Sequence, residues 1–142
     1  MPISKNILCV DSNDDHNELL KFFFEQAGFN VITCNTPGEC LHYTKEKRFS
    51  AIILDSWLED SVGLDILQIL KYLYPETPLI FFTGDARTKS REKAMKVGAS
   101  AYLVKPNDLD HIVSTVEGLI NFSTLPLLHN VEIQNYSNSY LN

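Results

Sequence analysis

Five short apolar segments recur along the chain, and their residues do not alternate with polar ones. They are rich in Ile, Val, Leu and Phe, which is typical of strands buried on both faces of a parallel sheet. The pattern therefore predicts five such strands, at residues 6–10, 30–34, 51–54, 79–82 and 101–104.

Amphipathic segments separate these strands and have helix signals at their ends. The first, 14–27, ends at Gly28, and its predicted buried face comprises Leu19, Leu20, Phe23 and Ala27. The second starts at Thr36, with Pro37 at the first helical position and Glu39 placed to complete a capping box.

Three more helices are predicted at 64–73, at 88–97 and from about Asp108 onward. The apolar stripe of the last one comprises Leu109, Ile112, Val113, Val116, Leu119 and Ile120. Strands and helices therefore alternate throughout. This order predicts an α/β fold, a doubly wound five-stranded parallel sheet in a three-layer sandwich, with right-handed crossovers.

The 142 residues suit one domain, which we expect to span 1–122. Beyond it, residues 123–142 contain no Lys or Arg and a single acid, Glu132. We expect this segment to be a C-terminal tail, either a short extended segment or a loose end, and we expect no output domain.

Neither a membrane span nor a secretory signal is apparent, because the longest apolar stretches fall far short of about 20 residues. Cys9, Cys34 and Cys40 have no metal-ligand spacing, and we expect them to act as small hydrophobic side chains in a reducing compartment. We therefore expect a cytoplasmic protein without membrane contact.

The net charge of −6 argues against direct nucleic-acid binding, which requires a basic surface. Five of the 12 basic residues nevertheless gather at one predicted helix: Arg87, Lys89, Arg91, Lys93 and Lys96. This cluster is either a solvated helix face or a binding surface for an acidic protein.

Polar residues follow four of the predicted strands. Asp11 follows the first strand, Asp55 the third, Thr83 the fourth and Lys105 the fifth. Any one of them alone could be a helix cap or a surface residue. Ligands of open parallel sheets bind beyond the carboxyl ends of the strands, so together these residues predict one site there.

These residues lie within longer motifs: Leu-Asp-Ser-Trp-Leu-Glu-Asp-Ser-Val-Gly-Leu around Asp55, Phe-Phe-Thr-Gly-Asp around Thr83, and Tyr-Leu-Val-Lys-Pro around Lys105. The set resembles the response-regulator receiver family of two-component signalling, a flavodoxin-like fold, over about 7–122. The resemblance implies a signalling phosphoacceptor and not an enzyme with an external substrate. Such a domain catalyses only its own phosphorylation and dephosphorylation.

The resemblance also implies roles for individual residues. Asp55 matches the phosphoacceptor that attacks the phosphohistidine of a histidine kinase or phosphotransfer protein. Asp11, Asp55 and the backbone carbonyl of Trp57 match groups that hold Mg²⁺. Thr83 matches the hydroxyl that turns toward the phosphoryl group, and Lys105 the lysine that pairs with it. These types suit phosphoryl transfer, which needs positioning and charge stabilisation.

Tyr102 matches the aromatic switch position, although a half-buried core aromatic is the alternative interpretation. Phosphorylation is then expected to change the face formed by the fourth helix, fifth strand and fifth helix. That face is where we expect an unidentified downstream protein or a second copy of the chain to bind. The family's lysine–proline bond is typically cis, and we expect the same of Lys105–Pro106.

Ser12 departs from the family, which usually has a second acid at this position that binds the metal. We therefore expect weakened Mg²⁺ binding, unless Asp14, Asp15 or Glu59 compensates. We also predict that Trp57 shields an acyl phosphate from water.

Ser12 also favours an alternative, a degenerate receiver that binds proteins without phosphorylation. A flavodoxin or an aspartyl phosphatase is disfavoured. The acidic segment after the first strand would repel a flavin phosphate, and Trp57 stands where a phosphatase typically has its second acid.

Overall fold

The computed structural model describes residues 5–58 and 61–123. All five predicted strands are present and form one parallel sheet in the order β2-β1-β3-β6-β7. Their bounds are Asn6–Val10 for β1, Asn30–Cys34 for β2, Ala51–Leu54 for β3, Leu79–Thr83 for β6 and Ala101–Val104 for β7. Only β6 departs from its predicted bounds, because it extends by one residue to include Thr83.

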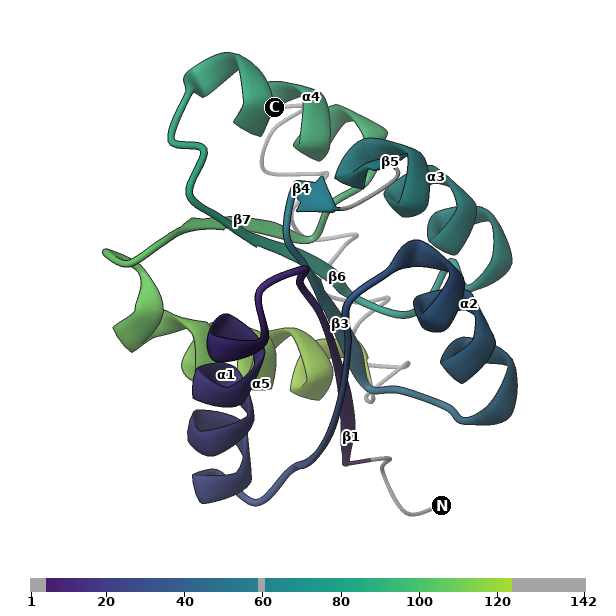
Figure 1. Ribbon diagram of the computed structural model, residues 1–142, viewed down its shortest axis with the longest axis vertical. Coiled ribbons are helices and arrows are strands. Elements are labelled where there is room, and N and C mark those ends of the chain that lie inside the picture. Colours follow the sequence, from purple (N-terminus) through teal and green to yellow (C-terminus); the bar gives the residue numbers. More distant parts are fainter. Residues whose placement is uncertain (1–4, 59–60, 124–142) are drawn as a thin grey trace, which may run out of the picture.

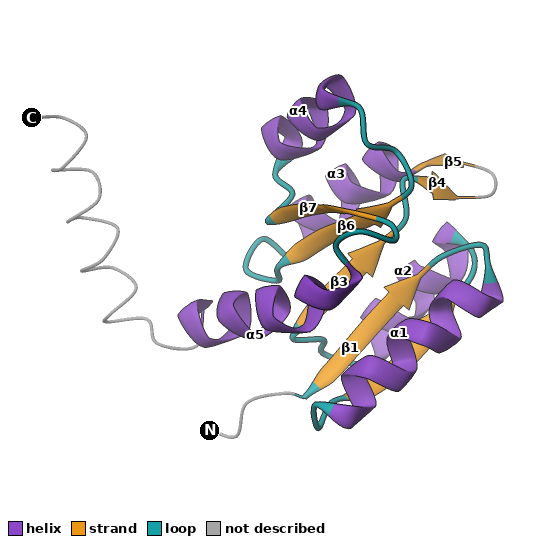
Figure 2. Cartoon of the chain, turned by 90° about the vertical axis from the view of Figure 1, so that its left-hand side faces the viewer, coloured by secondary structure: helices purple, strands orange, loops and turns teal. Residues whose placement is uncertain are grey.

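Helices cover both faces of the sheet, which confirms the three-layer α/β fold (Figure 1). One face is covered by α1 (Asp14–Gln26) and α5 (Ile112–Ser123), and the other by α2 (Pro37–Glu46), α3 (Gly63–Leu73) and α4 (Thr88–Val97). The turned view shows the same two layers, with α1 and α5 together on one side (Figure 2).

Two separate apolar cores result, because neighbouring residues of each strand point to opposite faces. On β1, Leu8 and Val10 belong to the core under α2, α3 and α4. Ile7 and Cys9 belong to the core under α1 and α5. Each strand is therefore buried on both sides, which explains its continuous apolar sequence.

The predicted buried face of the first helix is wrong in part. Leu20 is buried, but Leu19 and Phe23 are 43% and 36% exposed, and Phe24 is fully buried instead. Phe24 packs edge-to-face against Phe29, with ring centroids 5.8 Å apart. The run of neighbouring apolar residues covers more than one helix face, so periodicity alone did not select the buried one.

The ends of the other helices agree only in part with prediction. The Thr36 side chain accepts a hydrogen bond from the Glu39 N–H, but the Glu39 carboxylate reaches the N–H of Asn35, one residue before the expected partner. The last helix begins as a 3₁₀ turn, η1 (Leu109–His111), before α5.

A small antiparallel pair of strands, β4 (Trp57–Leu58) with β5 (Ser61–Val62), was not predicted.

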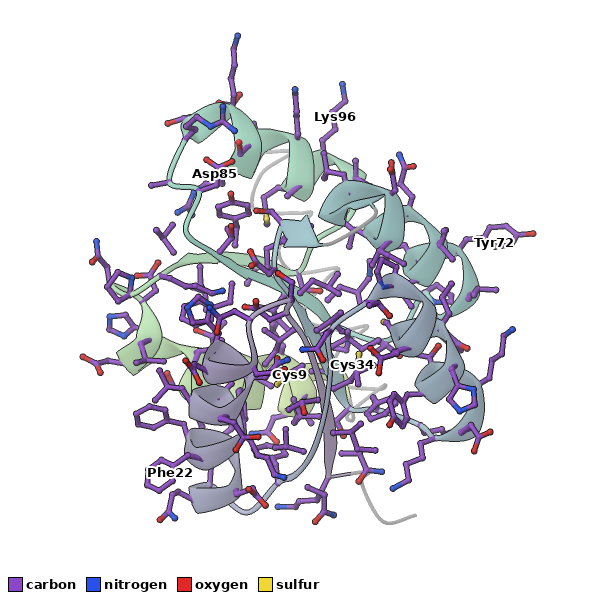
Figure 3. All side chains as sticks on the ribbon, viewed as in Figure 1. Cys9, Phe22, Cys34, Tyr72, Asp85 and Lys96 are labelled. Atoms are coloured by element: carbon purple, nitrogen blue, oxygen red, sulfur yellow. The ribbon has the colours of Figure 1, made fainter. Side chains whose placement is uncertain are left out.

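In the described part of the chain the three cysteines are buried and form no disulfide. Burial raises the pKa of the Cys9 thiol, which keeps it protonated and unreactive. Cys9 and Cys34 lie in the middle of the molecule, within the central sheet (Figure 3).

Among the described helices, none combines the length and apolar character that crossing a bilayer requires.

Candidate functional site

The ends of neighbouring strands hold the predicted site residues side by side. The Asp11 N–H donates to the Cys34 carbonyl at 3.1 Å, and the Asp55 N–H donates to the Val10 carbonyl at 3.0 Å. The Lys105 N–H donates to the Thr83 carbonyl at 2.8 Å. These bonds continue the sheet one step past each strand, so backbone pairing positions the site at the carboxyl edge.

The side chains of three site residues meet there. Lys105 Nζ donates to Asp11 Oδ2 at 2.5 Å and lies 3.5 Å from Asp55 Oδ2. The Asp11 carboxylate is 5% exposed, and those of Asp55 and Lys105 are 12% and 14% exposed. Burial strengthens this charge cluster, while Asp55 keeps some access to solvent.

The loop after β1 fixes the Asp11 carboxylate. Asp11 Oδ1 accepts from the Asn13 N–H at 2.9 Å. Asn13 in turn caps α1, accepting at its side chain from the N–H groups of Asp15 and His16. The buried Asn17 side chain donates to the Asp11 carbonyl at 3.0 Å. Oδ2 therefore contacts Lys105 while Oδ1 is held by the loop.

Thr83 ends β6, next to β3 in the sheet, and is fully buried. Its hydroxyl is 2.5 Å from the Ser56 hydroxyl and accepts from the Asp85 N–H at 3.2 Å. Ser56 follows Asp55 directly and was not singled out from the sequence. In the sequence, the only feature that pointed to Ser56 as a site residue was its position next to Asp55. The pair of hydroxyls forms a polar contact between the ends of β3 and β6.

His16, which the sequence analysis also missed, reaches into the site from the first turn of α1. Its Nδ1 is 3.0 Å from Lys105 Nζ and 3.3 Å from Asp11 Oδ2. The ring is 46% exposed, so His16 is the most exposed of the four residues in contact here. In the sequence, the only feature that pointed to His16 as a site residue was its position three residues after Asn13, the cap of α1.

The candidate metal ligands are mostly oxygen atoms, which suits Mg²⁺. Asp11 and Asp55 supply two carboxylates, but Ser12 is exposed. Asp14 is also exposed and accepts from the Asn35 side chain at 2.7 Å. Within residues 5–58 and 61–123, no group of three or more His, Cys, Asp or Glu side chains is arranged to hold a metal ion. The residues therefore fit Mg²⁺ in ligand type, with few charged ligands.

Three further sequence predictions concern the segment after Asp55 and the last strand. Trp57 begins β4, so its backbone lies two residues beyond Asp55, whereas its side chain is outside the described part of the structure. Glu59 is also outside it. The Lys105–Pro106 peptide bond is cis, as predicted.

Tyr102 has its ring in the core under α4. It is 4% exposed, and its ring centroid lies 5.9 Å from that of Phe81. The hydroxyl donates to the Asp85 carbonyl at 2.6 Å, and the Arg91 guanidinium lies 5.3 Å from the ring centroid. Burial raises the pKa of the Tyr102 phenol. Tyr102 is a core aromatic in this conformation, yet it also bonds to the loop after Thr83.

Asp85 holds that loop together. Its carboxylate accepts two hydrogen bonds from the Arg87 guanidinium, both at 2.9 Å, and one from the Ser90 hydroxyl at 2.6 Å. These bonds lower the pKa of the Asp85 carboxyl below its usual range. Asp85 lies in the loop between β6 and α4, next to the first turn of α4 (Figure 3). Thr83, Asp85 and Tyr102 therefore form one hydrogen-bonded connection.

Comparison with known proteins agrees with this arrangement. Residues 7–117 match the family model described as the response regulator receiver domain. The chain is 34% identical over 110 residues to an NtrX-like response regulator of Rickettsia bellii (strain RML369-C), covering 76% of this chain. It is 30% identical over 112 residues to the transcriptional regulatory protein ZraR of Escherichia coli (strain K12), covering 79% of this chain.

Solved structures agree as well. A response regulator receiver domain protein from Clostridium thermocellum has a TM-score of 0.78 and 29% identity, covering 84% of this chain and 97% of its own. The beryllofluoride-activated NtrC4 receiver domain dimer has a TM-score of 0.79 and 28% identity, covering 84% and 98%.

The fold and the site define a signalling domain of the α/β class. The chain belongs to the response regulator receiver domain family of two-component signalling. It spans only about a quarter of the length of its curated relatives, 23% of the NtrX-like protein and 25% of ZraR. The family assignment therefore concerns the receiver part that this chain shares with them.

Proposed function

We propose that Asp55 accepts a phosphoryl group from the phosphohistidine of a histidine kinase or phosphotransfer protein. An Asp55 carboxylate oxygen attacks phosphorus, the P–N bond breaks, and the histidine leaves as neutral imidazole after taking up a proton. The observation that carries this proposal is the Lys105 ammonium, which bonds to Asp11 and lies 3.5 Å from the partly exposed Asp55 carboxylate.

The chain's own residues have distinct tasks in this reaction. Lys105 stabilises charge on the transferring oxygens, because an ammonium in a partly buried site acts strongly on developing charge. The Thr83 hydroxyl, now bonded to Ser56, donates to the phosphoryl group after it arrives. Asp11, Asp55 and the Trp57 carbonyl would hold Mg²⁺, which supplies further charge neutralisation when bound. Ser12 makes this binding weak.

The signal leaves the site through the loop after β6. When Thr83 turns toward the phosphoryl group, its hydrogen bond with the Asp85 N–H changes. Since the Asp85 carbonyl also accepts from Tyr102, the change reaches the ring under α4. The face formed by α4, β7 and α5 is then altered for a downstream protein or a second copy. A receiver of NtrC4 is a dimer when activated by beryllofluoride.

A second candidate function is a phosphorylation-independent binding module. The exposed Ser12 in place of an acid favours it, because one metal ligand is missing. In that case Lys105, Asp11 and Asp55 form a permanent structural cluster, and the protein surface acts in a single state.

Intact-mass analysis after incubation with a small phosphodonor and Mg²⁺ separates the two functions. We expect one phosphoryl group on the wild type and on Asp65→Asn, which changes an exposed acid on α3, and none on Asp55→Asn. The binding-module function predicts no mass gain in any of the three proteins. A gain retained by Asp55→Asn would contradict the assignment of Asp55.

A further inference from the structure

The Lys105 ammonium is surrounded by three polar acceptors and one aromatic ring. It has three N–H donors, and Asp11 Oδ2, His16 Nδ1 and Asp55 Oδ2 lie 2.5, 3.0 and 3.5 Å from Nζ. The Phe82 ring centroid lies 5.6 Å from the same atom. Two hydrogen-bond contacts and one ion-pair contact therefore hold the ammonium in the resting protein.

Among these partners His16 stands apart, since it is neither acidic nor at the end of a strand. His16 Nδ1 lies 3.0 Å from Lys105 Nζ and 3.3 Å from Asp11 Oδ2. Because an ammonium only donates, a hydrogen bond between Nζ and Nδ1 has Nδ1 as its acceptor. In the tautomer that accepts this bond, the ring has its proton on Nε2. A neutral acceptor adds a directional bond without adding charge.

We propose that His16 is a positioning residue that holds the Lys105 ammonium at Asp11 and Asp55 in the resting site. Ser12 is exposed and contributes no charge at this edge, and the carboxylates in contact with the lysine are those of Asp11 and Asp55. His16 supplies the third contact. Its place is fixed because Asn13, the cap of α1, accepts from the His16 N–H at 3.2 Å.

This role deepens the proposed function. The contact between His16 and Lys105 does not depend on phosphorylation, whereas its effect on phosphoryl transfer rests on the proposed function. A phosphoryl oxygen on Asp55 would compete with the resting acceptors for the three donors of Lys105. His16 is the one member of the three that is not a carboxylate, and it is the one that Lys105 releases. His16 would then set how readily the lysine turns from its resting contacts to the phosphoryl group.

The test measures how accessible Lys105 is to a limiting acetylating reagent, by peptide mass spectrometry and relative to the exposed Lys45. Metal is removed by a chelator and no phosphodonor is added, so a protein that fails to be phosphorylated still gives a result. We expect His16→Ala to raise Lys105 acetylation about fivefold, because one bond to the ammonium is lost. His16→Asn should return it close to wild type, since an amide oxygen can accept in place of Nδ1.

His42→Ala is the matched control, since His42 lies on α2 with a side chain that is 67% exposed. It should leave Lys105 unchanged. Unchanged acetylation in His16→Ala, or equal effects of alanine and asparagine, would overturn the proposal. Calorimetric titration with Mg²⁺ alone supplies a second readout. A loosened Lys105 leaves Mg²⁺ affinity unchanged or a few times tighter, whereas weaker binding in His16→Ala would make His16 a metal ligand instead.

Discussion

At the scale of single residues, the site depends on which side-chain atoms of the loops after the strands contact Lys105. One carboxylate oxygen of Asp11 accepts from the Asn13 N–H, and the other accepts from the Lys105 ammonium. Ser12, the next residue, is exposed. Asp11 therefore belongs to the charge cluster. Ser12, where the family usually has a second acid, contributes no charge. We predict that this difference lowers the affinity of the site for Mg²⁺.

Ser12→Asp should tighten Mg²⁺ binding by about tenfold, because a third carboxylate adds charge beside a divalent ion. The measurement is a Mg²⁺ titration followed by calorimetry. Ser114→Asp, an exposed position on α5, is the control and should leave the affinity unchanged. Wild-type binding that is already as tight as in the Ser12→Asp variant would contradict the view that Ser12 weakens the site.

At the scale of elements, α1 shows how far periodicity predicts a buried face. Leu19, Leu20 and three consecutive phenylalanines offer apolar residues on several sides of the helix. Packing against the sheet selected Leu20 and Phe24, while Phe22 lies on the outer side of α1 (Figure 3). The choice depends on contacts with Phe29 and α5, which the sequence of the helix does not contain.

Two substitutions on the same helix test this assignment. Phe24→Ala should lower the free energy of unfolding by about 3–5 kcal/mol, because it removes a fully buried ring from a packed core. Phe22→Ala should change it by no more than about 0.5 kcal/mol, since that ring is 58% exposed. Urea unfolding measures both. Equal losses, or a larger loss for Phe22→Ala, would refute the packing of α1 described above.

The turn into α4 has a pH-dependent element in Asp85. Its bonds to Arg87 and Ser90 lower the pKa of the carboxyl in the folded protein. A lowered folded-state pKa stabilises the fold above the unfolded value of about 3.9, and this contribution declines as the pH falls toward the folded value. Asp85→Asn should therefore be less stable than wild type near neutral pH.

Urea unfolding of both proteins between neutral pH and about pH 3 measures this effect. The difference in free energy of unfolding should shrink below about pH 4, where the unfolded carboxyl becomes protonated. A difference that stays constant, or grows toward acid, would show that the hydrogen bonds of Asp85 do not act through its charge.

At the scale of the whole molecule, strand order explains why so much could be predicted. Buried strands have continuous apolar sequences, so all five were located to within one residue. Parallel strands place their carboxyl ends at one edge, so Asp11, Asp55, Thr83 and Lys105 were expected to meet there. The structure brings Asp11, Asp55 and Lys105 into contact, whereas the Thr83 hydroxyl contacts Ser56 and the Asp85 N–H. The roles of these residues in phosphoryl transfer remain predictions.

What could not be predicted depends on contacts between distant segments. His16 belongs to the site only because α1 leaves β1 at an angle that brings its first turn to Lys105. Ser56 is a site residue because β3 and β6 are neighbours, which brings its hydroxyl to Thr83. The β4–β5 pair is too short to show an alternating pattern. Sequence spacing along one element contains none of this information.

The central claim is that Asp55 is modifiable and that Asp11, Thr83 and Lys105 form one site with it. Adding beryllofluoride and Mg²⁺ while recording amide NMR spectra tests it most directly. We predict shifts that centre on these four residues and extend to Asp85 and Tyr102 in the wild type, and none in Asp55→Asn. Unchanged wild-type spectra, or equal shifts in Asp55→Asn, would contradict the account.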